Sequence, residues 1–462
     1  MNNLAEALRN RGEYEMAEQM HRQVLELREK VLGKEHADTL ANMNNLACVL
    51  DSLGEYKESE QMHRQTLELR EKVFGKEHSS TLDSMNNLAL VLGSLGKYEE
   101  AEQMHRQVLE LREKVLGKEH PSTLNSMNNL ASVLDSLGKY EEAEQMHRQS
   151  LELKGTVHGQ EHPDTLRSMN NLANVLRMLG KYEEAEQMHR QTLKLGEKVF
   201  GKKHPSTLDS MNNLAGALRH QGEYEKSEQM HRQTLELREK VLGKEHPDTL
   251  GSMNNLALVL DSLGKYDEAA KMHGQTLELK GTVLGKEHPD TLANMNNLAC
   301  VLYNLGEYEE AEKIYRQTLD LKEKVLGKEH PSTLDSMNNL ASVLYSLGKY
   351  EEAAEIYRQT LELKEKVLGK EHPDTLSSMN NLAEALRHQG EYEKAEEMHR
   401  QTLELKEKVF GKEHTDTISS MNNLAETLRH QGNYEEAEQI HRQTVELKEV
   451  ARDGHMFNTN VY

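Results

Sequence analysis

Strict internal repetition constrains this chain more than any other feature of its sequence. The string Met-Asn-Asn-Leu-Ala begins at residues 1, 43, 85, 127, 169, 211, 253, 295, 337, 379 and 421. These eleven copies are spaced by 42 residues and account for all 462 residues without an insertion or a deletion. A chain that repeats one unit in this way folds as a quasi-one-dimensional array, because each unit packs only on its neighbours. The sequence therefore predicts a single solenoid and not the roughly three domains that this length would otherwise suggest.

Each unit reads as a pair of helices, and the third copy with its lead-in shows why. Apolar residues at positions 82, 85, 88, 89, 92 and 95 recur at helical spacing and share one face. This pattern predicts a first helix, named the A helix, over residues 79–95, which Gly96 is suited to end. A second helix, the B helix, is expected over residues 97–116, with acidic residues in its first turn. The predicted fold class is therefore all-α.

Glycine and proline positions support these boundaries. Eleven of the 29 glycines, from Gly12 to Gly432, fill the turn between the two helices, and ten more, from Gly33 to Gly411, open the loop before the next unit. Proline costs about 3 kcal/mol inside a helix but is tolerated in the first turn. All seven prolines occupy the one slot after the loop histidine: Pro121, Pro163, Pro205, Pro247, Pro289, Pro331 and Pro373.

The repeated unit resembles the tetratricopeptide pattern, although it is longer than the usual 34 residues. The residues that carry this resemblance in the third copy are Leu88-Ala89, Gly96-Lys97-Tyr98 and Ala101. The chain is also similar to the repeat domain of kinesin light chains, through the segments 112–121, 128–131 and 138–143. Similar arrays form the sensor ends of fungal nucleotide-binding receptor proteins. The resemblance implies a right-handed superhelical solenoid of eleven helix pairs, whose A helices line a concave surface.

The array is expected to cover residues 1–450, and residues 451–462 leave the pattern and are expected to form a frayed tail. The first copy lacks the start of its A helix, so we expect the chain to be a fragment of a longer protein. No segment reads as the coiled coil of kinesin light chains or as a nucleotide-binding domain.

Composition and the absence of certain sequence signals limit the expected partners and cellular location of the protein. A formal net charge of -21 disfavours general binding to nucleic acid or to an anionic membrane. Cys48 and Cys300 lie six units apart, too far for a disulfide, so both are predicted to stay as thiols. The sequence shows neither a signal peptide nor an apolar run long enough to span a bilayer. We therefore expect a cytoplasmic protein.

Catalysis, cofactors and metals have no support in the sequence. The chain has 24 histidines, but Tyr315 and Tyr357 replace the B-helix histidine in two copies, which indicates a packing role for that slot. The recurring Gly-Lys pairs are not followed by the Ser or Thr of a phosphate-binding loop. Catalysis needs a singular constellation of residues, and pairs such as Glu99-Glu100 recur along the chain. We predict no enzyme activity, no cofactor and no metal site.

The copies differ mainly in four slots of the A helix. At about 100° per residue these slots share one arc, away from the apolar arc. The copies thus agree where they pack and differ where a ligand would lie, and neutral drift on an exposed face is the alternative. The second asparagine of each unit borders this arc, and the resemblance implies that it hydrogen-bonds the backbone of a bound peptide. Structural bonding between helices is the alternative for these candidates: Asn87, Asn129, Asn171, Asn213, Asn255, Asn297 and Asn339.

Charged and aromatic residues are distributed unevenly along the same arc. Two stretches carry arginines, whose planar guanidinium groups suit carboxylates. One comprises Arg167, Arg177, Arg219 and His220, and the other comprises Arg387 and Arg429 with His388 and His430. Between them, Tyr303 and Tyr345 are candidates to pack an apolar anchor. A solvated face of mixed charge is the alternative.

These observations predict a non-catalytic scaffold that binds extended, acidic segments of other proteins, as a kinesin-light-chain-like cargo adaptor would. Two alternatives stay open. The chain could be the sensor array of a larger receptor, or a structural spacer that self-associates through its apolar ends.

Overall fold

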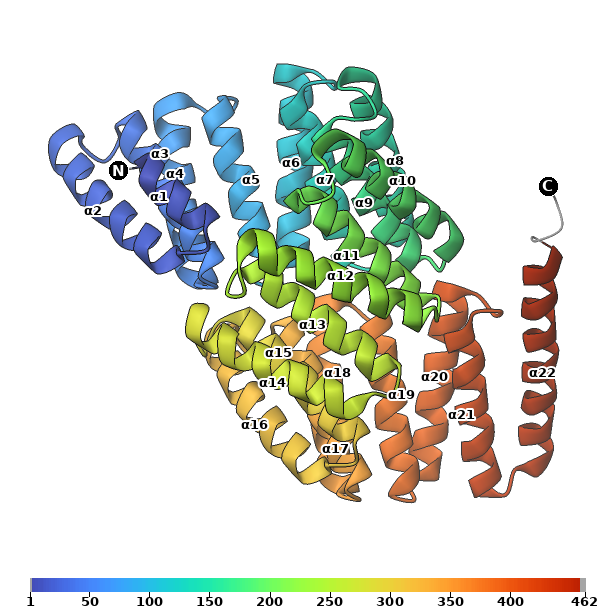
Figure 1. Cartoon of the computed structure of the whole chain (residues 1–462). Coiled ribbons are helices and arrows are strands. Elements are labelled where there is room, and N and C mark those ends of the chain that lie inside the picture. Colours follow the sequence, from blue (N-terminus) through green and yellow to red (C-terminus); the bar gives the residue numbers. More distant parts are fainter. Residues whose placement is uncertain (1, 458–462) are drawn as a thin grey trace. The chain divides into compact units, whose positions relative to one another are not determined.

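The computed structural model describes the backbone of residues 2–457 and the side chains of residues 4–9 and 11–447 (Figure 1). This part of the chain contains 22 α-helices and no strand. The helices alternate as A and B helices, so the predicted all-α solenoid of eleven helix pairs is confirmed.

The odd-numbered helices are the A helices. Their bounds are α1 (Asn2–Asn10), α3 (Ala37–Ser52), α5 (Ser79–Ser94), α7 (Pro121–Ser136), α9 (Pro163–Met178), α11 (Pro205–His220), α13 (Pro247–Ser262), α15 (Pro289–Asn304), α17 (Pro331–Ser346), α19 (Pro373–His388) and α21 (Thr415–Gln431). The predicted first helix over residues 79–95 thus ends one residue early, at Ser94.

The even-numbered helices are the B helices. Their bounds are α2 (Tyr14–Leu32), α4 (Tyr56–Phe74), α6 (Tyr98–Leu116), α8 (Tyr140–Val157), α10 (Tyr182–Phe200), α12 (Tyr224–Leu242), α14 (Tyr266–Val283), α16 (Tyr308–Val325), α18 (Tyr350–Leu368), α20 (Tyr392–Phe410) and α22 (Tyr434–Phe457). The backbone of α22 thus continues into the segment predicted as a frayed tail, and residues 458–462 of that segment lie outside the described residues.

Contacts divide the chain into two compact units. Unit 1 comprises the residues up to Leu305 together with Lys324–Leu326, and unit 2 comprises Gly306–Glu323 and the residues from Gly327 onward. Helix α16 contributes residues to both units.

The hydrophobic core contains small clusters, each formed by helices that are neighbours along the array. Leu88 and Leu92 of α5 pack with Ala101 of α6 and Val133 of α7, and all four are buried. Leu130, Leu134, Ala143 and Val175 form the equivalent cluster one repeat later. Each of these two clusters therefore joins an A helix, its B helix and the next A helix, so one repeat does not bury its apolar face alone.

The loop histidines begin the A helices. Nδ1 of His120 accepts a hydrogen bond from the backbone N–H of Ser122 at 3.2 Å, and Pro121 occupies the first turn. The same side-chain cap is present at all ten loop histidines from His36 to His414. A capping acceptor satisfies one of the first backbone N–H groups of a helix. The sequence had given these histidines no role, because histidine is not a usual capping residue.

The mid-helix histidines lie in the core between repeats. Burial lowers the pKa of six of them to about 4, with a smaller contribution from nearby cations: His63, His105, His147, His189, His231 and His273. Tyr315 and Tyr357 are also buried in this slot. No three His, Cys, Asp or Glu side chains among the described residues form a group that could hold a metal ion.

Ion pairs between repeats cover the outer surface of the B helices. Arg106 on α6 pairs with Glu142 on α8 at 2.6 Å, and Lys139 pairs back to Glu102 at 2.8 Å. The Arg–Glu pair recurs as Arg22–Glu58, Arg64–Glu100, Arg148–Glu184, Arg232–Glu268, Arg316–Glu352 and Arg400–Glu436. These pairs connect exposed B-helix residues of neighbouring repeats.

Unit 1 also brings distant repeats together. The turn after α3 meets the start of α15, where a Cβ added at Gly54 would overlap the Pro289 ring. Nε2 of His288 lies 3.3 Å from the backbone oxygen of Ser52 at the same contact. Gly12 makes the equivalent contact with the start of α13, since a Cβ at Gly12 would lie 3.0 Å from Cδ of Pro247.

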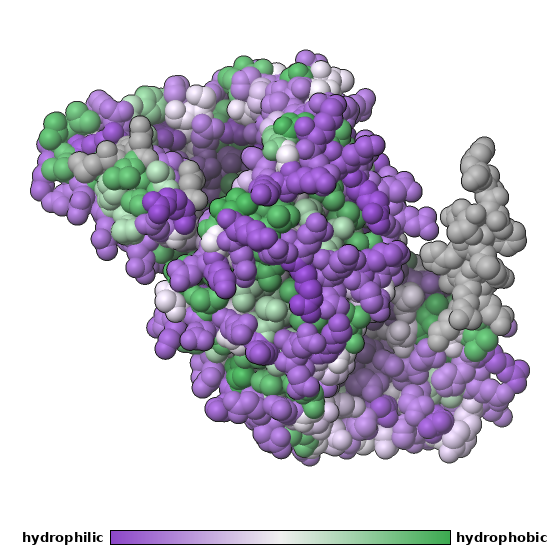
Figure 2. Space-filling model, in the orientation of Figure 1, coloured by the Kyte–Doolittle hydropathy of each residue, from purple (hydrophilic) through white to green (hydrophobic). Residues whose placement is uncertain are grey.

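The surface is mostly polar. On the face drawn in Figure 2, hydrophilic residues dominate and hydrophobic residues form small, separated patches. No helix among the described residues is both long and apolar enough to cross a membrane.

Candidate functional site

In unit 1, consecutive A helices lie against one another. Helix α7 contacts α9, α9 contacts α11 and α11 contacts α13, while each B helix packs mainly on the A helices beside it. The A helices are therefore more closely spaced than the B helices and form the inner layer of unit 1. We call the exposed surface of this layer the A face; its central part is formed by Asn174, Arg177, Asn213, Gly216, Arg219, His220, Asn255 and Leu258.

A pocket of about 180 Å³ opens on the A face. Residues of α9, α11 and α13 line it, with His231 of α12 beneath them. Five of the predicted binding residues meet here: Arg177, Arg219, His220, Asn213 and Asn255. Arg167 is not among them, because it lies near the start of α9, where it pairs with Asp164 at 3.2 Å.

Two guanidinium groups converge on one imidazole nitrogen in this pocket. Nη1 of Arg177 lies 3.0 Å from Nε2 of His220, and Nη2 of Arg219 lies 3.3 Å from the same atom. Partial burial of His220, together with the positive charge of the two arginines, lowers its pKa to about 4. The imidazole is therefore neutral near pH 7, and Nε2 is the acceptor.

Gly216 leaves room in this pocket, since a Cβ added there would meet nothing within 4 Å. Its slot holds glutamate in repeats 1, 10 and 11, where that glutamate pairs with the arginine three residues later. The pairs are Arg9–Glu6 at 2.5 Å, Arg387–Glu384 at 2.7 Å and Arg429–Glu426 at 2.9 Å. Repeats 5 and 6 have Asn174 and Gly216 in this slot. Within the described chain, neither Arg177 nor Arg219 is within ion-pair distance of a carboxylate.

The two predicted arginine stretches thus differ in their electrostatics. Arg387 and Arg429 are neutralised by glutamates of their own helices, whereas the charges of Arg177 and Arg219 face the pocket. Repeats 5 and 6 have no glutamate three residues before Arg177 and Arg219. This difference is visible in the sequence, because residues three apart on a helix are neighbours.

Comparison with known proteins supports the same architecture. The family described as tetratricopeptide repeat matches residues 1–72, 52–114, 80–156, 164–240, 206–282, 281–324, 290–366, 336–408 and 374–449. The chain belongs to the tetratricopeptide repeat family. The membership predicted from the Leu-Ala and Gly-x-Tyr spacing is therefore confirmed.

Three solved structures are similar to parts of this chain. Two are crystal structures of a Podosopora anserina kinesin light chain candidate with nearly identical TPR-like repeats, one of them a single-residue variant. Both are 31% identical, cover 44% and 45% of this chain and 97% and 98% of their own, and have TM-scores of 0.39 and 0.38. BtubC (BKLC) from P. vanneervenii is 18% identical, covers 50% of this chain and 92% of its own, and has a TM-score of 0.41. No curated protein matches the chain.

The asparagines of the tetratricopeptide repeats form a ladder between A helices. Nδ2 of the second asparagine donates to Oδ1 of the first asparagine in the preceding repeat, at 2.9 Å for Asn129 to Asn86. The same bond joins Asn87 to Asn44, Asn255 to Asn212, Asn297 to Asn254, Asn381 to Asn338 and Asn423 to Asn380. Asn171, Asn213 and Asn339 are half-buried in the same slot. The ladder is a structural role for these residues, and contact with a peptide stays a prediction.

The predicted aromatic positions belong to different units. Tyr303 is half-buried on α15 of unit 1. In unit 2, the ring of Tyr345 makes edge contacts with Tyr350 at 5.3 Å and with His388 at 5.1 Å. Tyr345 is thus part of a three-ring cluster on the tetratricopeptide array, and its use as an anchor for a ligand stays a prediction.

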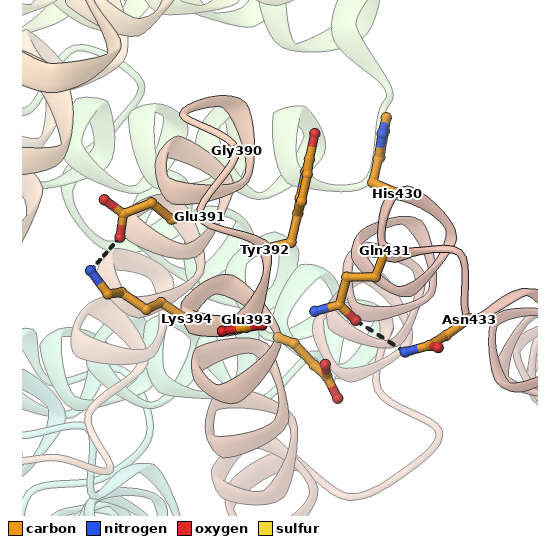
Figure 3. A pocket seen from close by; sticks show the side chains of 9 residues that line it. Gly390, Glu391, Tyr392, Glu393, Lys394, His430, Gln431 and Asn433 are labelled. Atoms are coloured by element: carbon orange, nitrogen blue, oxygen red, sulfur yellow. Dashed lines mark hydrogen bonds and ion pairs between the residues drawn. The ribbon is translucent and has the colours of Figure 1, made fainter.

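A second pocket, of about 760 Å³, lies in unit 2 at the turns of the last two helix pairs (Figure 3). Tyr392 stacks on His430 with ring centres 5.9 Å apart, Lys394 pairs with Glu391, and Gln431 accepts from Asn433 at 3.2 Å. These polar groups are paired with one another, and the pocket lies at helix ends. We therefore regard the pocket on the A face as the candidate site.

Proposed function

We propose that this protein is a non-catalytic scaffold that binds extended segments of partner proteins along the A face of unit 1 and holds an anionic side chain of the partner in the pocket. Its role would be that of a kinesin-light-chain-like cargo adaptor in the cytoplasm. The observation that carries this proposal is the pair Arg177 and Arg219, which face the pocket with no carboxylate of the described residues within ion-pair distance; Asp135 and Asp261 act on them from farther away.

Charge supports this assignment. The chain has a net charge of -21, so a site with two arginines is a local exception to the field of the whole molecule. Arginine binds carboxylates and phosphates through paired N–H groups, and such charge-assisted bonds are stronger than neutral ones. Three other copies of the repeat neutralise an arginine in the same slot. An anionic ligand would do the same for repeats 5 and 6.

The amides beside the arginines support an extended ligand. Asn213 and Asn255 line the pocket and are half-buried on successive A helices. An amide offers a donor and an acceptor, which matches the unpaired backbone groups of an extended peptide. Asn255 uses one N–H in its 3.1 Å bond to Asn212, which leaves its second N–H and its oxygen for a ligand.

The test compares two matched double variants of the whole chain. Arg177→Gln/Arg219→Gln removes the two arginines of the pocket, and Arg387→Gln/Arg429→Gln removes two arginines from the same slot where glutamate already pairs them. We expect the first variant to lose at least tenfold in affinity for peptides with one central acidic residue, taken from a random library, and the second to keep it. Equal binding by both variants would overturn the proposal, and concentration-dependent assembly without peptide binding would favour a structural spacer.

A further inference from the structure

We infer that the pocket of Arg177, Arg219 and His220 takes a phosphorylated side chain, in a peptide that carries basic residues on both sides of the phosphate. This inference rests on the proposed function and names the class of ligand for the same site.

The hydrogen bonds among the side chains of the pocket point to an acceptor with several oxygens. Nε2 of His220 has one lone pair, but Nη1 of Arg177 and Nη2 of Arg219 both lie within 3.3 Å of it. One acceptor thus serves two charged donors, and Nη1 of Arg219 adds a long bond of 3.5 Å to Oγ of Ser262. A single arginine fork saturates a planar carboxylate. A phosphate has three terminal oxygens in a tetrahedral arrangement and can accept from both arginines at once.

The charge of the pocket also fits a dianion. Two guanidinium groups converge here, and a phosphate monoester carries a charge of about -1.5 to -2 at pH 7. A single carboxylate would neutralise only one of them. Gly216 adds the space for the larger group, because a Cβ there would have no neighbour within 4 Å and the pocket measures about 180 Å³.

Aspartates flank the arginines on the neighbouring A helices. In four consecutive repeats the same slot holds Asp135 on α7, Arg177 on α9, Arg219 on α11 and Asp261 on α13. A peptide that crosses these helices would therefore meet negative charge, then the two arginines, then negative charge again. This order favours a partner whose phosphate lies between basic residues.

The spacing of the helices sets the distance along the peptide. The pocket lies between α9 and α11, so either aspartate is about one and a half helix layers away, which is about 13 Å at about 9 Å per layer. An extended chain advances about 3.4 Å per residue, so about four residues separate the pocket from the level of either aspartate. Lysine or arginine is therefore expected roughly four residues before and after the phosphorylated residue.

The test uses three random peptide libraries whose central residue is fixed as phosphoserine, glutamate or serine. We expect the intact protein to retain the phosphoserine library at least tenfold better than the glutamate library, with Lys or Arg enriched about four residues on either side. Arg177→Gln/Arg219→Gln should abolish this preference, and Arg387→Gln/Arg429→Gln should leave it unchanged.

Three outcomes would overturn the inference. Equal retention of the phosphoserine and glutamate libraries, both lost in Arg177→Gln/Arg219→Gln, would keep the scaffold function and exclude a preference for phosphate. Retention of no library would refute both the inference and the proposed function. Inorganic phosphate that binds as tightly as the phosphopeptides would assign the pocket to small anions.

Discussion

Nη1 of Arg177 lies 3.0 Å from Nε2 of His220, so the side chains of two successive A helices meet at one point on the A face. This contact predicts that the pKa of His220 lies below the usual value for histidine. Partial burial and the charges of Arg177 and Arg219 lower the pKa of His220 to about 4. We expect NMR titration of its ring, assigned by loss of the signal in His220→Ser, to give a midpoint near this value. In Arg177→Gln/Arg219→Gln the midpoint should rise but stay below about 6.5, because the partial burial of the ring remains. A midpoint near 6.5 in the intact protein would contradict the geometry of the pocket.

The buried histidines predict that acid destabilises unit 1. Burial lowers the pKa of His105 in the folded protein to about 4, below the roughly 6.5 of the unfolded chain. The unfolded state therefore binds more protons between these values, so stability rises with pH through this window and is lost as the pH falls. One such histidine costs about 2 kcal/mol at pH 5 relative to pH 8.

The variant His105→Tyr isolates this effect, because tyrosine occupies the same slot in repeats 8 and 9. Urea unfolding at pH 5 and pH 8 should show a smaller loss of stability for the variant than for the parent, by about 2 kcal/mol. An equal loss in both proteins would show that His105 does not titrate in this range.

The asparagine ladder predicts that loss of one of its asparagines lowers the free energy of unfolding. Asn129→Ala removes the 2.9 Å bond to Asn86 and leaves a half-buried oxygen without that donor, which should cost about 1 kcal/mol in the free energy of unfolding. Gln107→Ala, at an exposed position on the neighbouring B helix, should change it by less than about 0.5 kcal/mol. Equal effects, measured by urea unfolding, would remove the structural role of the ladder.

The contact between distant repeats of unit 1 predicts that a substitution of Gly54 loosens the start of α15. Gly54→Ala and Gly180→Ala introduce a side chain at the same turn position of two repeats, where φ is 76° and 74°. The Cβ at position 54 would overlap Pro289, whereas a Cβ at position 180 would meet nothing within 4 Å. Hydrogen exchange of residues 286–291 should therefore rise in Gly54→Ala and stay unchanged in Gly180→Ala. An equal response would show that the contact does not form in solution.

The sequence predicts the fold well because its signals are local. Gly96 and Pro121 bracket α6, and the helix begins at Tyr98 and ends at Leu116 as their positions indicate. His105, Tyr315 and Tyr357 occupy the same position in their repeats, and all three are buried. The replacement of histidine by tyrosine at this position indicates such a packing role. Each of these features depends on residues within one repeat and its neighbour.

The candidate site could be predicted only in part. Variation between copies makes Arg177 and Arg219 candidates, but variation alone does not show which arginines are neutralised. That distinction follows from the glutamate three residues before Arg387 and Arg429, a local signal that the comparison of variable slots does not use. The contact of Nη1 of Arg177 with His220 joins two repeats and has no local signal. The contact of Gly54 with Pro289 depends on the pitch of the array, which is the sum of small rotations between repeats and leaves no local signal.

The location of the ligand is the central claim, and photocrosslinking tests it most directly. Leu258 lines the pocket on the A face, whereas Gln233 is exposed on the B helix α12. Each residue is replaced in turn by benzoylphenylalanine in the whole chain, and the protein is irradiated in cells. We predict discrete covalent adducts from position 258 that disappear with Arg177→Gln/Arg219→Gln, and none from position 233. Adducts from position 233 alone, or adducts from position 258 that persist without the two arginines, would contradict the assignment of the binding surface.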